Sequence, residues 1–205
     1  MSRYTGPKAR VSRRLGTNIF GTKGETVALD KRPYPPGEHG RSRRRTTASE
    51  YLLQLQEKQK ARFTYGLTER QFRNLYAEAG RRTGVTGENM LTYLELRLDN
   101  VVYRAGWAAT RPQARQFVLH GHMSVNGRRV SIPSYRVSAG DEVAVREKSR
   151  AMAPLQWNVD VLDRVPPVWL EVVEEGLAAN VLSAPTRDQI DVPIREQLIV
   201  ELYSK

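Results

Sequence analysis

Apolar residues recur at helical spacing in the middle of the chain. Over residues 68–82 one side of a helix collects four of them, Phe72, Leu75, Tyr76 and Ala79. Thr68 followed three residues later by Gln71 has the capping-box spacing that starts a helix. The same signal predicts a helix from Thr47 to about Phe63 and a shorter one that begins at Thr110.

Two further segments show the helical period. The apolar positions between Leu91 and Ala105 predict one amphipathic helix that ends at Gly106. From Pro193 onwards a closing helix places four apolar residues on one face, Ile194, Leu198, Ile199 and Leu202.

After residue 122 the apolar residues recur at every second position, which is the spacing of a β-strand. Met123 and Val125 alternate with polar neighbours, Asn126-Gly127 is a two-residue hairpin turn, and Val143 and Val145 lie in a further strand. The same alternation predicts strands over 155–161 and 168–172. Helices followed by a small antiparallel sheet make an α+β fold.

Charge narrows the class of partner. The chain has 205 residues and a formal net charge of +11. Residues 1–50 hold 12 Lys and Arg against 4 acids, whereas residues 151–205 hold 4 against 9. This excess requires a polyanion, of which nucleic acid is the simplest and an acidic membrane surface the alternative. The acidic last quarter should face away from RNA.

Other functional classes are excluded by what the sequence lacks. There is no Cys, so thiolate nucleophiles, disulfides and Cys-based zinc sites are absent. No apolar run has the length of a membrane span or of a signal-peptide core, so we expect a soluble, unexported protein without membrane contact.

Residues 1–46 show neither helical nor strand periodicity and are rich in Gly, Pro and Arg. We expect an extended basic segment that orders only against a partner. It precedes a helical domain of residues 47–90 plus 187–205. Inserted in that domain, residues 91–186 form a unit with two helices and a small antiparallel sheet, with its core at about 94–150.

Candidate RNA-binding residues follow from this placement. Arg111 and Arg115 lie one turn apart at a helix N-terminus, where backbone N–H groups also attract phosphate. The hairpin that follows supplies His122, Asn126, Arg128 and Arg129. In the helix from Thr47, the stripe of Gln54, Lys58 and Arg62 is either an ordinary solvated face or a phosphate contact.

Some of these residues carry a family resemblance. Four stretches resemble the S-four RNA-binding domain: Arg97-Leu98-Asp99-Asn100 through Arg104-Ala105-Gly106, Thr110-Arg111 to Gln116, His120-Gly121-His122, and Val125-Asn126-Gly127. The flanks at 32–40, 50–72 and 189–205 extend the resemblance to the S-four family of bacterial small-subunit (30S) ribosomal proteins, in a zinc-free form.

The resemblance implies a cytoplasmic, ribosome-bound structural protein. Such proteins are primary binders of the 16S rRNA 5′ domain, nucleate assembly of the 30S body, and lie near the place where mRNA enters. They affect translational accuracy through contact with ribosomal protein number five, and ribosomal protein number twelve is linked to them in this function. Some members repress translation of their own operon. Shape, phosphates and 2′-hydroxyls dominate recognition of helical RNA, which suits Arg-rich helices and tails.

Carried over residue by residue, the resemblance implies an RNA surface from three parts of the chain. They are Arg13, Arg14, Arg41, Arg43, Arg44 and Arg45 in the N-terminal segment; Gln54, Lys58, Arg62 and Arg73 in the helical domain; and Arg111, Arg115, His122, Asn126, Arg128 and Arg129 in the module.

The sequence departs from the family at one point. Many relatives carry a zinc-binding Cys cluster near the N-terminus, and His39 alone cannot replace it, so no cofactor is expected. His120 and His122 have no acidic or Cys cluster near them in sequence, which argues against a metal pair.

An enzyme is the competing interpretation. Pseudouridine synthases carry the same module and a catalytic Asp in an Arg-Leu-Asp motif, which Arg97-Leu98-Asp99 matches. No separate catalytic domain remains, however, so we expect Asp99 to be a structural partner of an Arg and expect no small-molecule substrate. A free RNA chaperone or a DNA-binding helix-turn-helix protein would leave the N-terminal segment and the closing helix unexplained.

Overall fold

The computed structural model describes residues 4–41, 49–162, 164–173 and 177–204, which form two compact units. The first unit comprises Met1–Gly87 and Val192–Lys205, and the second comprises Glu88–Asp191. The second unit is therefore an insertion in the sequence of the first. The helix α5 (Thr86–Glu95) spans the sequence boundary between them.

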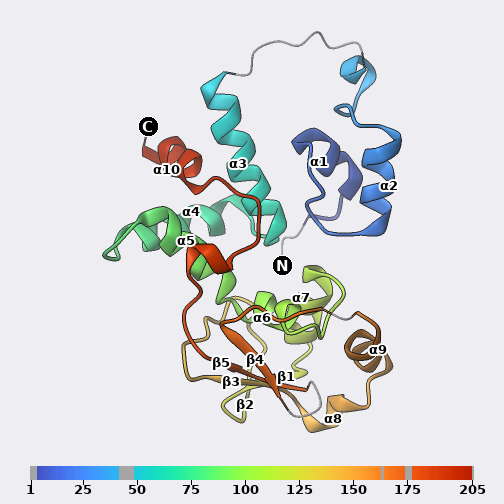
Figure 1. Ribbon diagram of the computed structural model, residues 1–205, viewed down its shortest axis with the longest axis vertical. Helices are drawn as coiled ribbons and strands as arrows, with labels where there is room; N and C mark the ends of the chain where they lie inside the picture. The colour runs from blue at the N-terminus through green and yellow to red at the C-terminus, as the bar shows by residue number, and fades with distance from the viewer. Residues whose placement is uncertain (1–3, 42–48, 163, 174–176, 205) are drawn as a thin grey trace. The chain divides into compact units, whose positions relative to one another are not determined.

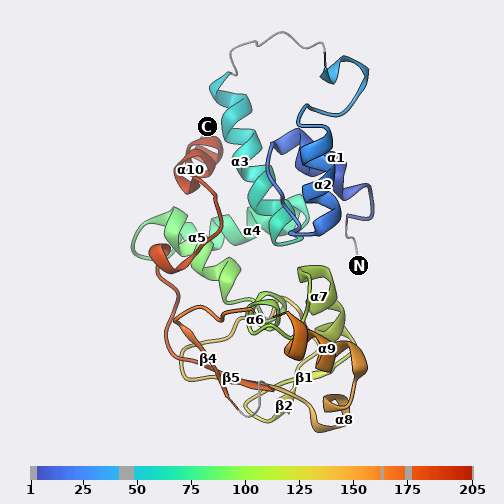
Figure 2. The same ribbon diagram turned by 45° about the vertical axis from the view of Figure 1, so that its right-hand side comes forward.

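Three helices form the main part of the first unit: α3 (Glu50–Thr64), α4 (Glu69–Gly80) and α10 (Glu196–Ser204). α10 packs along α3 although the two lie far apart in the chain (Figures 1 and 2). Phe72, Leu75 and Ile199 are buried, as the helical spacing predicted. Thr68 and Gln71 form the predicted capping box at the start of α4.

The N-terminal segment contains regular structure, so the prediction of an extended segment without helices is wrong. Its helices are α1 (Lys8–Leu15) and α2 (Lys23–Lys31), followed by a 3-10 helix (Glu38–Gly40). Val11, Leu15 and Ile19 bury their side chains against Phe20 and against Phe63 of α3. The sequence prediction treated the segment alone, whereas Phe63 supplies apolar surface from another part of the chain.

The start of α3 also differs from the prediction. Ser49, rather than Thr47, is the N-cap, and its hydroxyl accepts a hydrogen bond from the backbone N–H of Leu52 at 3.3 Å. Ser49 has extended backbone angles, which exclude a helix that begins two residues earlier. Thr47 itself lies outside the described residues.

The second unit packs helices against an antiparallel sheet. α6 (Leu98–Arg104) and α7 (Arg111–Leu119) lie on one side of the sheet (Figures 1 and 2). Its strands run in the order β2-β1-β3-β5-β4, with bounds Met123–Val125 for β1, Arg128–Arg129 for β2, Glu142–Val145 for β3, Leu170–Val173 for β4 and Ala178–Val181 for β5. The predicted α+β class is confirmed.

The hairpin between β1 and β2 turns at Asn126 and Gly127. Both have positive φ, 50° and 75°, as a type I′ turn requires. β1 pairs with β3 so that Met123 faces Val145 and Val125 faces Val143. These four side chains are buried with Trp107 in the core of the unit. Alternation of apolar residues therefore predicted this part of the sheet correctly.

The predicted single helix over 91–105 is wrong, because the chain breaks between α5 and α6. Arg97 forms an isolated bridge with Arg136, and the N–H of Leu98 donates to the carbonyl oxygen of Tyr135 at 2.8 Å. The backbone groups at 96–98 thus find partners about forty residues away, which no helical period reveals.

The strand predicted over 155–161 is also wrong. This segment is α9 (Ala153–Val161), preceded by the short helix α8 (Glu147–Arg150). Pro154 lies in the first turn, where proline is tolerated. Leu155 and Asn158, three residues apart, are buried, while Trp157 and Val161 are exposed. Burial therefore follows the helical period and not the alternation.

The strand predicted over 168–172 corresponds to β4, which begins two residues later, at Leu170. A second 3-10 helix (Arg187–Gln189) follows β5. In the described ranges no helix is long and apolar enough to cross a membrane.

Candidate nucleic-acid interface

α7 begins as the sequence predicted. The hydroxyl of Thr110 accepts from the N–H of Gln113 at 3.4 Å, and the Gln113 side chain accepts from the N–H of Ala109 at 2.8 Å. Pro112 lies in the first turn. Two backbone donors at the helix start are thereby satisfied, which fixes the direction of the turn that carries Arg111 and Arg115.

Arg111 is held by neighbours on α6. Its Nε donates to Oδ1 of Asn100 at 2.9 Å, and its guanidinium lies 4.3 Å from the ring centre of Tyr103. The Asn100 amide in turn donates to Oε2 of Glu95 at 2.8 Å. Arg111 therefore has a fixed orientation, and the residue is half-buried.

Arg115 belongs to an ion-pair triad around Asp99. Arg97 donates to both carboxylate oxygens of Asp99, at 3.0 and 2.7 Å, and Arg115 donates to Oδ2 at 3.1 Å. Asp99 is buried and lies between two guanidinium groups. Such a carboxylate is a structural partner, as expected.

A second buried network lies beneath the same helices. Arg104 donates to both oxygens of the fully buried Glu95 at 2.9 Å each, and to Asp191 at 2.6 Å. Burial lowers the pKa of Arg104, but hydrogen bonds and charge from Glu95 and Asp191 outweigh it and raise the pKa overall. The hydrogen bond from Arg104 lowers the pKa of Asp191 below its usual value.

Arg164 is a contributor that sequence reasoning missed. It donates to the carbonyl oxygen of Tyr103 in the last turn of α6, at 2.6 Å, and to those of Ala108 and Ala109 in the loop from α6 to α7, at 3.0 and 3.4 Å. Its guanidinium lies 3.8 Å from the ring centre of Tyr103. A single Arg in an acidic stretch gives no signal of this role, because its partners lie more than fifty residues earlier.

The hairpin turn is locked by Asn126. Its amide donates to Asp141 at 2.8 Å and its carbonyl accepts from the N–H of Glu142 at 2.9 Å. The residue predicted to lie on RNA thus has a structural role. Arg128 and Arg129 of β2 are exposed beside it.

Cations gather where α7 ends. The Arg129 side chain lies directly over Gly121, so that a Cβ there would collide with the guanidinium. Arg146 donates to the carbonyl oxygen of Gly121 at 3.2 Å, and Nδ1 of His122 lies 2.9 Å from the hydroxyl oxygen of Ser149. Partial burial lowers the pKa of His122 below 6.5, and the charges of His120, Arg146 and Arg129 lower it further. Positive charge is therefore concentrated here.

The predicted module residues lie on α7 and on the hairpin that follows it. Arg111 and Arg115 lie in the N-terminal half of α7, and His122 and Arg129 lie at its C-terminal end. We call the residues Arg111, Arg115, His122, Arg128 and Arg129 the α7 surface.

The stripe on α3 points inward. Gln54 and Lys58 are buried, Gln54 donates to Glu201 of α10 at 3.0 Å, and Lys58 donates to Glu69 at 2.7 Å. Arg62 donates to Gln59 at 2.8 Å and packs on Phe63. Packing with α4 and α10 thus occupies polar groups of Gln54 and Lys58 within the protein.

The remaining predicted residues differ in their positions. Arg73, Arg14 and Arg41 are exposed. Arg13 donates to the carbonyl oxygens of Arg32 and Tyr34, at 3.0 and 3.1 Å, and therefore has a structural role. Arg43, Arg44 and Arg45 lie outside the described residues.

Metal binding finds no support in the described ranges. No group of three His, Cys, Asp or Glu side chains lies where it could hold a metal ion. The rings of His120 and His122 are 6.0 Å apart, and Nδ1 of His122 faces Ser149.

Comparisons with known proteins cover the whole chain. The model of the ribosomal protein S4/S9 N-terminal domain matches residues 3–95, and the model of the S4 domain matches residues 96–143. Curated proteins named small ribosomal subunit protein uS4 align along the full length of both chains. Identity is 57% for Corynebacterium ammoniagenes, 58% for Corynebacterium glutamicum strain R and 57% for Saccharopolyspora erythraea. The two family matches and an identity of 57–58% over the full length of the chain show that it belongs to the uS4 family of small ribosomal subunit proteins.

Proposed function

We propose that this protein is a structural constituent of the small ribosomal subunit that binds 16S rRNA through the α7 surface. The observation that carries the proposal is the arrangement of cations along α7. Arg111 is oriented by Asn100 and Tyr103, and Arg129 is positioned over Gly121. Guanidinium groups fixed before binding lose less entropy when they meet phosphate, so they favour affinity.

The α7 surface suits recognition of RNA shape. Arg groups form charge-assisted, bidentate hydrogen bonds with phosphates. Arg111 begins the nine-residue helix α7, and Arg129 lies over Gly121 just after its end, so the cations of this surface can reach different phosphates of one folded RNA. RNA helices are read mainly through phosphates and 2′-hydroxyls, for which this spacing of cations is sufficient.

Family membership supports the finer parts of the proposal. We infer a primary binder of the 16S rRNA 5′ domain that nucleates assembly of the 30S body in the cytoplasm. On the same ground we infer that the protein contacts ribosomal protein number five and thereby contributes to translational accuracy. We also infer that it lies near the path of mRNA and that it represses its own operon, as some relatives do. Each of these rests on the family and not on a particular contact in this chain.

Family and geometry both oppose the enzyme alternative. The full-length relatives are ribosomal proteins, and Asp99 is enclosed by Arg97 and Arg115. Robust tritium release from labelled uridine RNA that disappears in Asp99→Ala would overturn this conclusion.

A binding titration tests the RNA proposal. The full chain is titrated against a 16S 5′-domain transcript at several salt concentrations, and log Kd is plotted against log salt. Arg128→Gln with Arg129→Gln should weaken binding and reduce the salt slope by about 2, one for each phosphate that is no longer neutralised. Arg70→Gln with Arg81→Gln removes the same charge from α4 and its C-cap and is the control. Equal affinity and slope in wild type and the hairpin variant would contradict the proposal.

A further inference from the structure

The loop of residues 105–110 joins α6 to α7 and leads directly into Arg111. Gly106 has a φ of 84°, and the next two residues, Trp107 and Ala108, are buried. A loop that enters the core takes its backbone carbonyl groups away from water, and each of them then needs a donor. The donors that meet these carbonyls therefore fix the start of α7.

Two side chains from a later part of the chain supply these donors. Asn158 of α9 is buried, and its amide donates to the carbonyl oxygen of Trp107 at 2.9 Å. Arg164 donates to the carbonyl oxygens of the next two residues, Ala108 at 3.0 Å and Ala109 at 3.4 Å. Three consecutive carbonyl groups of the loop are thus held by side chains that follow 51 to 56 residues later.

Tyr103 connects Arg164 to Arg111. Arg164 donates to the carbonyl oxygen of Tyr103 at 2.6 Å, and its guanidinium lies 3.8 Å from the centre of the Tyr103 ring. The guanidinium of Arg111 lies 4.3 Å from the centre of the same ring. Cation–π attraction holds each guanidinium against the ring. A displacement of Arg164 therefore shifts the aromatic surface on which Arg111 rests.

The surroundings of Arg164 disfavour its charge. Burial lowers the pKa of its guanidinium, and the nearby charges of Arg111 and Arg104 lower it further, against the opposite effect of Tyr103 and Asp191. The terminal nitrogens of Arg164 are directed at backbone carbonyls and offset this cost. We therefore expect Arg164 to act on RNA through Arg111 and not through a contact of its own.

Arg164 also lies outside the two family matches. The S4 domain match covers residues 96–143, which include the loop and Arg111, and the other match ends at residue 95. The support for this part of the module therefore comes from the acidic last quarter of the chain, which charge alone would exclude from RNA binding.

We propose that Arg164 is a positioning residue for RNA binding, which holds the loop of residues 105–110 and the Tyr103 ring so that Arg111 meets RNA in a fixed orientation. This inference rests on the proposed function. A guanidinium whose orientation is fixed before binding loses less entropy when it meets a phosphate. The acidic last quarter thereby contributes to RNA affinity without touching RNA.

Two variants remove the positioning contacts in different ways. Arg164→Lys keeps the positive charge, but its single nitrogen cannot reproduce the planar fork that spans three carbonyl groups and the ring. Tyr103→Leu removes the ring and leaves the backbone carbonyls that Arg164 binds. Circular dichroism and thermal unfolding establish that each full-length variant is folded at the temperature of the binding experiment.

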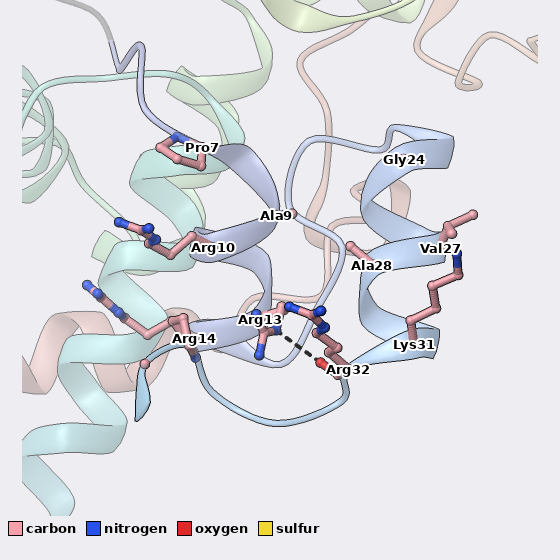
Figure 3. A pocket seen from close by; sticks show the side chains of 12 residues that line it. Pro7, Ala9, Arg10, Arg13, Arg14, Gly24, Val27, Ala28, Lys31 and Arg32 are labelled. Atoms are coloured by element: carbon pink, nitrogen blue, oxygen red, sulfur yellow. Dashed lines mark hydrogen bonds between the residues drawn. The ribbon is translucent and has the colours of Figure 1, made fainter. Parts of the chain in front are cut away.

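Arg13 of the first unit supplies the matched control, because it anchors another loop in the same way. It donates to the carbonyl oxygens of Arg32, Tyr34 and Pro35, and its guanidinium lies 5.0 Å from the ring centre of Tyr34. Figure 3 shows the contact with the Arg32 carbonyl. Arg13→Lys therefore makes the same chemical change at an anchor whose partners all belong to the first unit.

RNA affinity is measured in double-mutant cycles with the 16S 5′-domain transcript. Arg164→Lys and Tyr103→Leu should each weaken binding about fivefold when Arg111 is present, and should have little effect in the Arg111→Gln background. In the Arg129→Gln background the full loss should remain. Arg13→Lys should have the same effect with and without Arg111.

The Nε–H of Arg111 reports its orientation in the absence of RNA. In the wild type it donates to Asn100 at 2.9 Å, so nuclear magnetic resonance should show slow exchange of this proton with water. Arg164→Lys should accelerate the exchange severalfold, whereas Arg13→Lys should leave it unchanged.

Three outcomes overturn the proposal. They are unchanged affinity of both positioning variants, an equal loss with and without Arg111, which a general loss of structure would produce, and unchanged exchange of the Arg111 proton in Arg164→Lys. If Arg111→Gln weakens binding while both positioning variants bind as wild type, the positioning role fails and the proposed function stands. If Arg111→Gln and Arg129→Gln both bind as wild type, the α7 surface fails and this inference fails with it.

Discussion

Arg104 and Glu95 form a two-point ion pair in which Nε and one terminal nitrogen of the guanidinium each lie 2.9 Å from a carboxylate oxygen. Glu95 ends α5 and Arg104 ends α6, so the pair fastens the two helices together across the break at Arg97. Glu95 is fully buried and also accepts from Asn100, which orients Arg111. The pair therefore supports both the fold and the α7 surface.

Glu95→Ala should destabilise the protein by about 3 kcal/mol, because removal of one member of a buried ion pair leaves the other without full compensation. Asp191 still accepts from Arg104, which keeps the loss at the lower end of the expected range. Chemical denaturation of the full chain measures the change. Glu171→Ala, at an exposed position of β4, should stay within about 0.5 kcal/mol. Comparable losses in both variants would refute a special role for Glu95.

Arg115→Ala should reduce both stability and RNA affinity. Its partner Asp99 is buried and would keep only the ion pair with Arg97. The free energy of unfolding should therefore fall by about 1–3 kcal/mol. Arg128→Ala removes an exposed side chain and should reduce affinity alone. Thermal unfolding and RNA titration of both variants separate the two effects. An Arg115 variant with wild-type stability would show that the triad contributes little.

RNA affinity should rise as the pH falls toward and below 6.5, through titration of His122. The pKa of His122 is lowered in the free protein, so the neutral imidazole persists below the pH at which an unfolded chain protonates. A nearby phosphate favours the protonated, charged form of His122. By thermodynamic linkage, protonation of His122 therefore strengthens RNA binding by the same factor by which RNA binding favours protonation. Nuclear magnetic resonance of the His122 ring should show a midpoint below 6.5 that moves up when RNA binds.

His122→Gln supplies the control for this pH effect. It should remove most of the pH dependence of affinity between about pH 5 and 7, the range in which histidine titrates, while His120 remains. A His122 midpoint that does not move when RNA binds would place the ring away from the phosphates.

Asn126→Ala should destabilise the hairpin by about 1–2 kcal/mol. Ala at φ 50° is strained, and the substitution removes the hydrogen bonds with Asp141 and Glu142. Asn126→Gly keeps the backbone conformation and removes only the side-chain hydrogen bonds, so it should cost less. Thermal unfolding ranks the variants, and a Gly variant that is no more stable than the Ala variant would show that backbone strain at φ 50° contributes little.

The sequence by itself determined the elements that depend on neighbouring residues. Thr68 with Gln71 starts α4 and Asn126-Gly127 turns the hairpin, because caps and tight turns are satisfied within four residues. The alternation at Val143 and Val145 likewise revealed a strand with one buried face. The family motifs are local runs of the same kind, which is why the sequence alone indicated a ribosomal RNA-binding protein.

Only the tertiary structure decided which polar side chains are buried or paired within the protein. The sequence places Gln54 in a stripe with Lys58 and Arg62. In the structure, its side chain donates to Glu201, which lies 147 residues later in the chain. Arg13 has the sequence context of an RNA ligand, but in the structure its Nε–H is shared between the carbonyl oxygens of Arg32 and Tyr34. The helices α1 and α2 also depend on Phe63 of α3 for part of their apolar contact. Burial and hydrogen-bond pairing depend on residues far away in the chain, and no local pattern contains that information.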